Sequence, residues 1–201
     1  MEAGLVASWS EPSRDAVTGI LGDYRNPTLP GKLALVLVSI AGYWLSGVLA
    51  EAVDQDAANW LVFPLHHAPG LIFGLLVLGP YVARPPYALR LIAMAVASAV
   101  IYYLAVLFVI EGPFSYNTIT PYLVSGGTAA SLVATSTMLL APRVWRWMPL
   151  LVTAIVGIAG GATFEWDPLA DSEWFSLVVP HAVWQVLVCL ALHLSLRPAR
   201  T

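Results

Sequence analysis

Three histidines lie within long apolar stretches of the chain. His66 and His67 are adjacent in one stretch, and His181 lies in another. Imidazoles bind metal ions and haem iron, and they also exchange protons near neutral pH. Because an ionisable side chain is costly in an apolar segment, these histidines are candidates for a functional site.

Carboxylates, a phenol and an amide are expected at a similar level. Apolar stretches that run in the opposite direction end at Glu51, Glu111 and Glu165. Each histidine lies about seven residues into its stretch, which is roughly 10 Å along an α-helix. Tyr102 precedes Glu111 by about two to three helical turns, and Gln185 follows the third histidine by about one turn. The residues predict one polar pocket near one membrane surface.

We expect this pocket to bind a divalent metal ion, a haem or another small ligand from the outer side. The candidate metal ligands are its histidines and glutamates, namely His66, His67, His181, Glu51, Glu111 and Glu165. The candidate cofactor contacts are His66, His67, His181, Tyr102 and Gln185. Adjacent helical residues point about 100° apart, so at most one of the paired histidines faces the third, and the sequence leaves open which. Alternatively, the histidines only hydrogen-bond their neighbours and fix the packing.

Several other chemistries are excluded by the residues present. The only lysine is Lys32, at the edge of an apolar stretch, so no retinal Schiff base forms within the bundle. The chain has no phosphate-binding loop of the Walker type and no basic cluster suited to nucleic acid. Its single cysteine, Cys189, excludes an intrachain disulfide.

The elements that position these residues are predicted to be six transmembrane helices. The chain has 201 residues, 59% of them hydrophobic and 10% charged, and its mean hydropathy is +0.77. A helix of about 20 apolar residues crosses a hydrocarbon core of roughly 30 Å. Such stretches recur at residues 32–53, 60–82, 90–110, 119–141, 147–166 and 176–196. The sequence therefore predicts an all-α, compact six-helix bundle.

The positions of the basic residues predict the orientation of this bundle. All of them precede the first span, begin it, follow the last span or lie in alternate connections: Arg14, Arg25, Lys32, Arg84, Arg90, Arg143, Arg146, Arg197 and Arg200. Cytoplasmic segments concentrate Lys and Arg, so both termini are expected in the cytoplasm and the pocket is expected to open outward. The short loops between the spans favour a bacterial inner membrane, and the scarcity of lysine beside arginine favours a GC-rich genome.

The chain is expected to divide into a cytoplasmic segment, residues 1–31, with a short interfacial helix, and a transmembrane domain, residues 32–201. Small residues gather in the fourth span, and the fifth contains Gly157 and Gly161 in a GxxxG pair. Such faces let helices approach closely, so the fourth and fifth spans are expected to pack tightly. The sequence leaves open whether this contact lies within one chain or forms a homo- or hetero-oligomer.

A serine lies at a depth similar to that of the third histidine. Ser125 is about six residues into the fourth span, and a Ser/His pair hydrolyses peptide or ester bonds. Six helices, a cytoplasmic N-terminus, a serine in the fourth helix and a histidine in the sixth resemble the layout of rhomboid-type intramembrane serine proteases. The resemblance implies Ser125 and His181 as a catalytic pair, although Leu123 replaces the first glycine of the family's Gly-x-Ser-Gly motif. Close packing of small residues also accounts for this serine.

Four functions follow as hypotheses from these residues. The first is a membrane protein whose outward-facing pocket binds a metal, a haem or a small ligand for redox, sensing or catalytic use. The others are a proton-coupled transporter of a small solute, an intramembrane hydrolase, and a structural or accessory subunit. Leu76, Met94 and Leu192 are typical of the apolar inner halves of the spans, which favours a one-sided site over a through-path.

Overall fold

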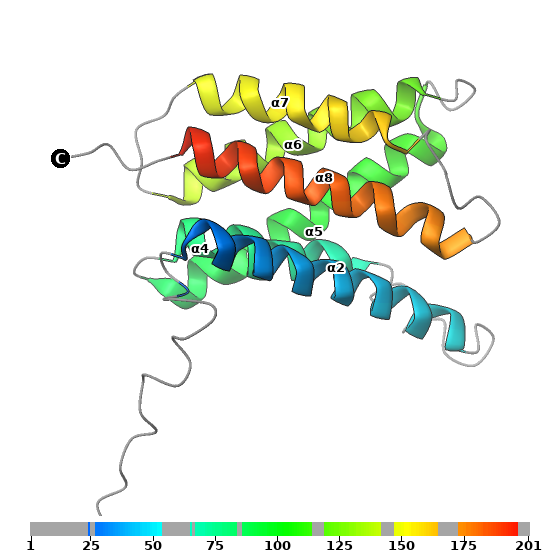
Figure 1. Cartoon of the computed structure of the whole chain (residues 1–201), viewed down its shortest axis with the longest axis horizontal. Coiled ribbons are helices and arrows are strands. Elements are labelled where there is room, and N and C mark those ends of the chain that lie inside the picture. The colour runs from blue at the N-terminus through cyan, green and yellow to red at the C-terminus, as the bar shows by residue number, and fades with distance from the viewer. Residues whose placement is uncertain are drawn as a thin grey trace, which may run out of the picture.

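The computed structural model describes residue 24 and residues 27–53, 65, 67–83, 86–113, 119–141, 147–164 and 173–196, without the side chains of residues 51 and 173–177. Within these ranges every regular element is a helix, and the helices lie side by side in one bundle (Figure 1). The all-α prediction is confirmed for this part of the chain.

Four of the described helices are long and apolar enough to cross a membrane. They are α2 (Leu29–Ala52), α5 (Tyr87–Glu111), α6 (Thr120–Leu140) and α8 (Glu173–Ser195). Their ends differ from those of the first, third, fourth and sixth predicted spans by at most three residues. The chain therefore has the helices of a membrane protein.

Two shorter apolar helices match the second and fifth predicted spans. They are His67–Val82, which contains the π-helix η2 (Gly74–Leu78) and α4 (Gly79–Val82), and α7 (Trp147–Ala162). The 16 residues of α7 rise about 24 Å, less than a hydrocarbon core of roughly 30 Å. Residues 60–64, 66, 165 and 166 of the predicted spans lie outside the described part. The six-span count and the orientation therefore stay predictions, as does the helix within residues 1–31.

Prolines and a threonine cap mark where the helices begin. Thr28 caps α2, its hydroxyl accepting the Gly31 amide at 3.4 Å, and a proline follows in the first turn. Pro86 precedes α5, and Pro121 lies in the first turn of α6. A proline suits these positions because the first amides of a helix have no partner within it.

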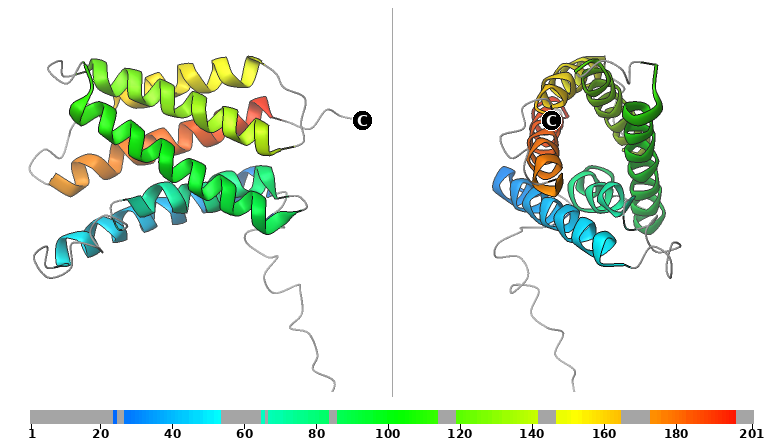
Figure 2. Two further views of the ribbon diagram at one scale, coloured as in Figure 1. Left: turned by 180° about the vertical axis from the view of Figure 1, so that it is seen from behind. Right: turned by 90° about the vertical axis from the view of Figure 1, so that its right-hand side faces the viewer.

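The helices form a ring, seen nearly end-on in Figure 2. Each helix contacts its neighbour in the sequence, and contacts between α2 and α8 close the ring. Sequential neighbours run antiparallel, as short connections require. Side chains from helices far apart in the sequence therefore meet inside the bundle.

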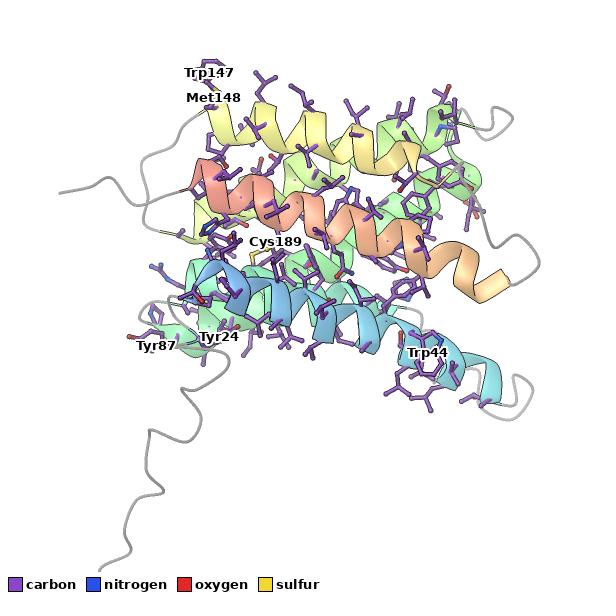
Figure 3. The ribbon with its side chains drawn as sticks, viewed as in Figure 1. Tyr24, Trp44, Tyr87, Trp147, Met148 and Cys189 are labelled. Carbon is purple, nitrogen blue, oxygen red and sulfur yellow. The ribbon has the colours of Figure 1, made fainter. Side chains whose placement is uncertain are left out.

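The surface of the bundle is apolar, whereas much of its interior is small or polar. Leu37 of α2, Ile92 of α5 and Ile155 of α7 are 66%, 61% and 58% exposed. Trp147 and Met148 point outward from the start of α7 (Figure 3). Inside, Ser39, Thr137 and Thr153 are fully or almost fully buried. Apolar residues outside and small or polar residues inside are typical of helices packed in lipid.

The two ends of the bundle differ in charge among the described residues. At one end Lys32 donates to His193 Nδ1 at 3.0 Å, and Arg90 donates to the Leu140 carbonyl at 2.7 Å. The second contact places a cation on the C-terminus of α6, where the helix dipole favours it. Glu111 is exposed at the opposite end, where α5 finishes. We call these the Lys32 end and the Glu111 end.

Helices α6 and α7 pack backbone to backbone through glycines. A Cβ atom on Gly126 would lie 2.5 Å from the Gly157 carbonyl oxygen, and one on Gly161 would lie 2.3 Å from the Tyr122 carbonyl oxygen. The predicted tight packing of these helices is confirmed, and it lies within one chain. An oligomer formed through small-residue faces stays a prediction.

The second apolar helix contains a π-turn, which a proline follows and in which a tyrosine hydroxyl bonds to a backbone carbonyl. Pro80 has no amide hydrogen, so the Leu75 carbonyl has no donor in an i to i+5 turn. The Tyr24 hydroxyl donates to that carbonyl instead. Gly79 leaves room for it, because a Cβ atom there would overlap the Tyr24 hydroxyl. Tyr24 is thus held against the second apolar helix.

Candidate functional site

A cavity of about 780 Å³ lies inside the ring, in the half of the bundle nearer the Glu111 end. It is lined by residues from α2, the second apolar helix, α5, α6 and α8 and by Phe164 just beyond α7. Five residues selected from the sequence line it: His67, Tyr102, Ser125, His181 and Gln185. Most of the remaining lining is apolar or aromatic. Toward the Lys32 end the interior is filled by Met94, Val188 and Leu192, all fully buried.

His181 is enclosed by aromatic rings from three other parts of the bundle. It stacks on Tyr43 of α2, with ring centroids 4.6 Å apart and planes 22° apart. Tyr102 of α5 lies at 5.5 Å in a tilted arrangement, and Phe164 lies at 5.2 Å edge-on. Pro180 precedes this histidine within α8 and removes one helical hydrogen bond there. The imidazole is therefore held in a fixed orientation at the wall of the cavity.

The hydroxyls of Tyr43 and Tyr102 share a hydrogen bond beside this imidazole. The bond joins α2 to α5 at the wall of the cavity. It uses one of the two phenolic protons, so the pair retains a second proton to donate. Tyr43, Tyr102 and His181 together form a polar patch in an otherwise apolar space.

Gln185 adds an unsatisfied acceptor one turn further along α8. Its side chain is 3% exposed, and its Oε1 atom has no hydrogen-bond partner in the described part of the chain. A buried acceptor without a donor costs about 1–3 kcal/mol. A ligand or water that donates to this oxygen would recover that cost.

The indole of Trp184 joins α8 to α6 along the cavity wall. Its Nε1 donates to the Gly126 carbonyl oxygen at 3.3 Å, and its ring lies 5.8 Å from that of Phe73. Gly160 makes room, because a Cβ atom there would lie 2.9 Å from the indole. The cavity wall is thus fixed by packing on both sides.

The two described histidines near the cavity contact different tyrosines. His67 lies 5.0 Å from Tyr103, which is 39% exposed, whereas His181 contacts the adjacent Tyr102 inside the ring. Consecutive residues of a helix point about 100° apart, so the two imidazoles meet different sides of α5.

Ser125 has a structural hydrogen bond in this arrangement. Its hydroxyl donates to the Ala105 carbonyl oxygen of α5 at 3.0 Å, and its side chain is 8% exposed. A serine has one proton to donate, so here the proton goes to a carbonyl. The Ser/His pairing implied by the rhomboid-like layout stays a prediction.

The metal prediction depends largely on residues outside the described part. Within that part no three His, Cys, Asp or Glu side chains gather closely enough to hold an ion. His66, Glu165 and the side chain of Glu51 are not described. Glu111 lines a separate groove between α5 and α6. The described residues therefore include no three-ligand metal group, and the metal and haem predictions stay open for the six candidate ligands.

Comparison with protein-family models, with curated proteins and with solved structures gives no match for this chain. Its function is therefore argued from the cavity.

Tyr43 and Phe164 were not among the residues selected from the sequence, yet they enclose His181. A signal for Tyr43 exists in the first span, where Ser39, Tyr43 and Ser46 recur at helical spacing among apolar residues. No comparable pattern marks Phe164.

Proposed function

We propose that this chain is an integral membrane protein that binds a small, largely apolar molecule inside its helix bundle. The observation that carries the proposal is the cavity of about 780 Å³ with one polar patch. Sites for small organic molecules commonly measure about 300–1,000 Å³ and are mainly apolar, with a few placed polar groups. We infer six crossings, cytoplasmic termini and an inner-membrane location, with the cavity nearer the outer surface.

The polar patch defines what the bound molecule must present. Tyr43 and Tyr102 retain one phenolic proton to donate, and Gln185 Oε1 lacks a donor within the described residues. A ligand group that both accepts and donates a hydrogen bond, such as a hydroxyl, complements these groups. The rest of the molecule is apolar, since Phe73, Ile101 and Val133 are among the side chains around it.

This binding function agrees better with the geometry than transport does. Fully buried Met94, Val188 and Leu192 fill the core between the cavity and the Lys32 end. A polar solute would have to cross this apolar layer, which offers it no partners. The cavity is therefore a one-sided binding site in this conformation.

A hydrolase is the second candidate, because Ser125 and His181 line the same cavity. Incubation with a transmembrane peptide substrate and with a lipid ester tests it. Cleavage that disappears in both Ser125→Ala and His181→Ala would favour the hydrolase over a binding protein.

The test of the proposed function is chemical analysis of the purified protein. The full chain is purified in mild detergent, and its visible spectrum, metal content and organic extract are measured on one sample. We expect a colourless, metal-free protein that carries an organic amphiphile in a near-stoichiometric amount. A haem spectrum or a stoichiometric metal would contradict the proposal, and so would an extract that contains only detergent and bulk lipid in proportion to the membrane.

A further inference from the structure

A second hollow lies on the outside of the bundle, between α5 and α6. This groove has a volume of about 470 Å³ and runs to Glu111 and Gly112 at the Glu111 end. Leu104 and Leu132 on its two sides are 48% and 40% exposed. They lie within two of the helices long enough to cross a membrane, so the groove faces hydrocarbon.

The groove and the cavity are two sides of one thin wall. Four residues line both of them: Ile101, Ala105, Ser125 and Ala129. Three of these have small side chains, so little more than their atoms separates the bilayer from the cavity. A small outward movement of α5 from α6 would join the two spaces.

One side-chain hydrogen bond ties α5 to α6 at this wall, in addition to the Arg90–Leu140 bond at the Lys32 end. Ser125 of α6 donates to the Ala105 carbonyl oxygen of α5 at 3.0 Å. Ala105 lies inside α5, where its carbonyl oxygen is also available to the helix's own hydrogen bonds. The serine bond therefore uses a second lone pair of that oxygen. The bond can break without unfolding either helix.

Glycine packing or ring stacking holds three other seams of the ring. Gly126 and Gly157 bring α6 and α7 into backbone contact. Gly70 does the same between the second apolar helix and α5, because a Cβ atom there would lie 2.7 Å from Ala99 Cα. The Tyr43–His181 stack joins α2 to α8. At the groove the wall between α5 and α6 consists of Ile101 and three small side chains instead.

The charge at the mouth of the groove limits what passes through it. The exposed carboxylate of Glu111 lies at the end of the groove, beyond its apolar sides. A hydrocarbon chain fits between Leu104 and Leu132, and a neutral or zwitterionic headgroup avoids repulsion by Glu111. The occupant favoured by these observations is an uncharged or zwitterionic lipid.

We propose that the molecule in the cavity is a membrane lipid whose hydrocarbon chain enters sideways from the bilayer through the α5–α6 groove, with Ser125 as the latch of this portal. This proposal rests on the proposed binding function and names the class of ligand and its route. Gln185 and the Tyr43–Tyr102 pair then receive a polar group of the lipid inside the bundle.

Photo-crosslinking in proteoliposomes tests the route. The probe is a zwitterionic phosphatidylethanolamine, whose headgroup both donates and accepts hydrogen bonds, with a diazirine in its acyl chain. The labelled residues of the full chain are mapped by peptide mass spectrometry. We expect label on Leu104 and Leu132 and also on Phe73 and Val133, which line the cavity and are 4% and 1% exposed. Label confined to the groove and to the lipid-facing residues would overturn the proposal.

Two variants test the Ser125 hydrogen bond and the thickness of the wall separately. Ser125→Ala removes the hydrogen bond without adding bulk, so labelling of Phe73 and Val133 should become roughly two- to tenfold faster while groove labelling stays unchanged. Ala129→Phe thickens the wall, and cavity labelling should fall while groove labelling remains. An unchanged rate in Ser125→Ala overturns the latch, even if Ala129→Phe fails to fold.

The outcome for the route is distinguishable from that for the binding function. If an organic amphiphile still co-purifies but the diazirine lipid labels only the groove, the cavity binds its ligand by another path and the portal is wrong. If no amphiphile co-purifies and the cavity stays unlabelled, the binding function fails as well.

Discussion

The imidazole of His181 stacks on the phenol ring of Tyr43, and this contact joins the last helix of the bundle to the first. The ring centroids lie 4.6 Å apart, and the two residues are separated by most of the chain. Contacts between α2 and α8 close the ring around the cavity, so this stack serves both the fold and the site.

Replacing His181 separates these two roles. His181→Ala removes a ring packed among Tyr43, Tyr102 and Phe164 and is expected to lower stability by about 2–3 kcal/mol. His181→Phe keeps a ring of similar size and is expected to cost less than about 1.5 kcal/mol. Thermal unfolding in detergent measures both. Equal destabilisation by the two substitutions would show that the imidazole's hydrogen bonds, and not its packing, hold α8 in place.

Gln185→Leu is expected to stabilise the empty protein while weakening the site. The substitution removes a buried acceptor that has no donor among the described residues, a gain of about 1 kcal/mol. It also removes a partner for the ligand's polar group. Unfolding of ligand-stripped protein and the organic content of the purified protein measure the two effects. A less stable empty protein that retains its ligand would contradict this role for Gln185.

Much of the helical arrangement could be predicted from the sequence because chain length and apolar runs determine it. The ends of α2, α5, α6 and α8 were predicted to within three residues. The close approach of Gly157 and Gly161 to α6 followed from the small size of these residues. His67, Tyr102, Ser125 and Gln185 were assigned to a common level by helical rise alone, and they line one cavity with His181.

The contacts across the ring could not be predicted in the same way. In a membrane helix both faces are apolar, so the pattern that tells inside from outside in a soluble protein is weak. The position of Tyr43 on His181 depends on α2 meeting α8, which no local pattern specifies. The π-turn at Gly74–Leu78 depends on Pro80 and on Tyr24 from another segment. The α5–α6 groove likewise arises only when both helices are in place.

Gly157→Ala is expected to destabilise the bundle by about 2 kcal/mol or more. The new methyl group would lie 2.4 Å from the Gly126 carbonyl oxygen and 2.4 Å from Ala130 Cβ, and helix backbones cannot move apart cheaply. Gly42→Ala is the matched control. The nearest atoms to its methyl group all belong to the Ile72 side chain, with Cδ1 at 2.9 Å and Cγ2 at 3.2 Å, and a side chain adjusts more easily than a helix backbone. Comparable losses of thermal stability in the two variants would contradict backbone packing of α6 on α7.

Tyr24→Phe and Gly79→Ala are expected to act on one contact. The first removes the hydroxyl that the Leu75 carbonyl accepts, at a cost of about 1 kcal/mol. The second displaces the same hydroxyl by steric overlap. In a double-mutant cycle measured by thermal unfolding, the combined effect should be clearly smaller than the sum. If the two losses of stability simply added, the Tyr24 hydrogen bond would not depend on the space that Gly79 leaves.

The binding of an organic molecule inside the cavity is tested most directly by mass spectrometry of the extract from wild-type protein, Ala129→Phe and Ala41→Phe. Ala129 is 7% exposed and lies in the wall between the cavity and the groove, whereas Ala41 is exposed on the lipid-facing side of α2. We expect one amphiphile in near-stoichiometric amount in wild-type protein and in Ala41→Phe. In Ala129→Phe we expect the amount to fall by a factor of about five or more, because overpacking costs about 1–3 kcal/mol of binding free energy. Equal amounts in all three proteins, or no bound molecule in the wild type, would contradict a ligand-binding cavity.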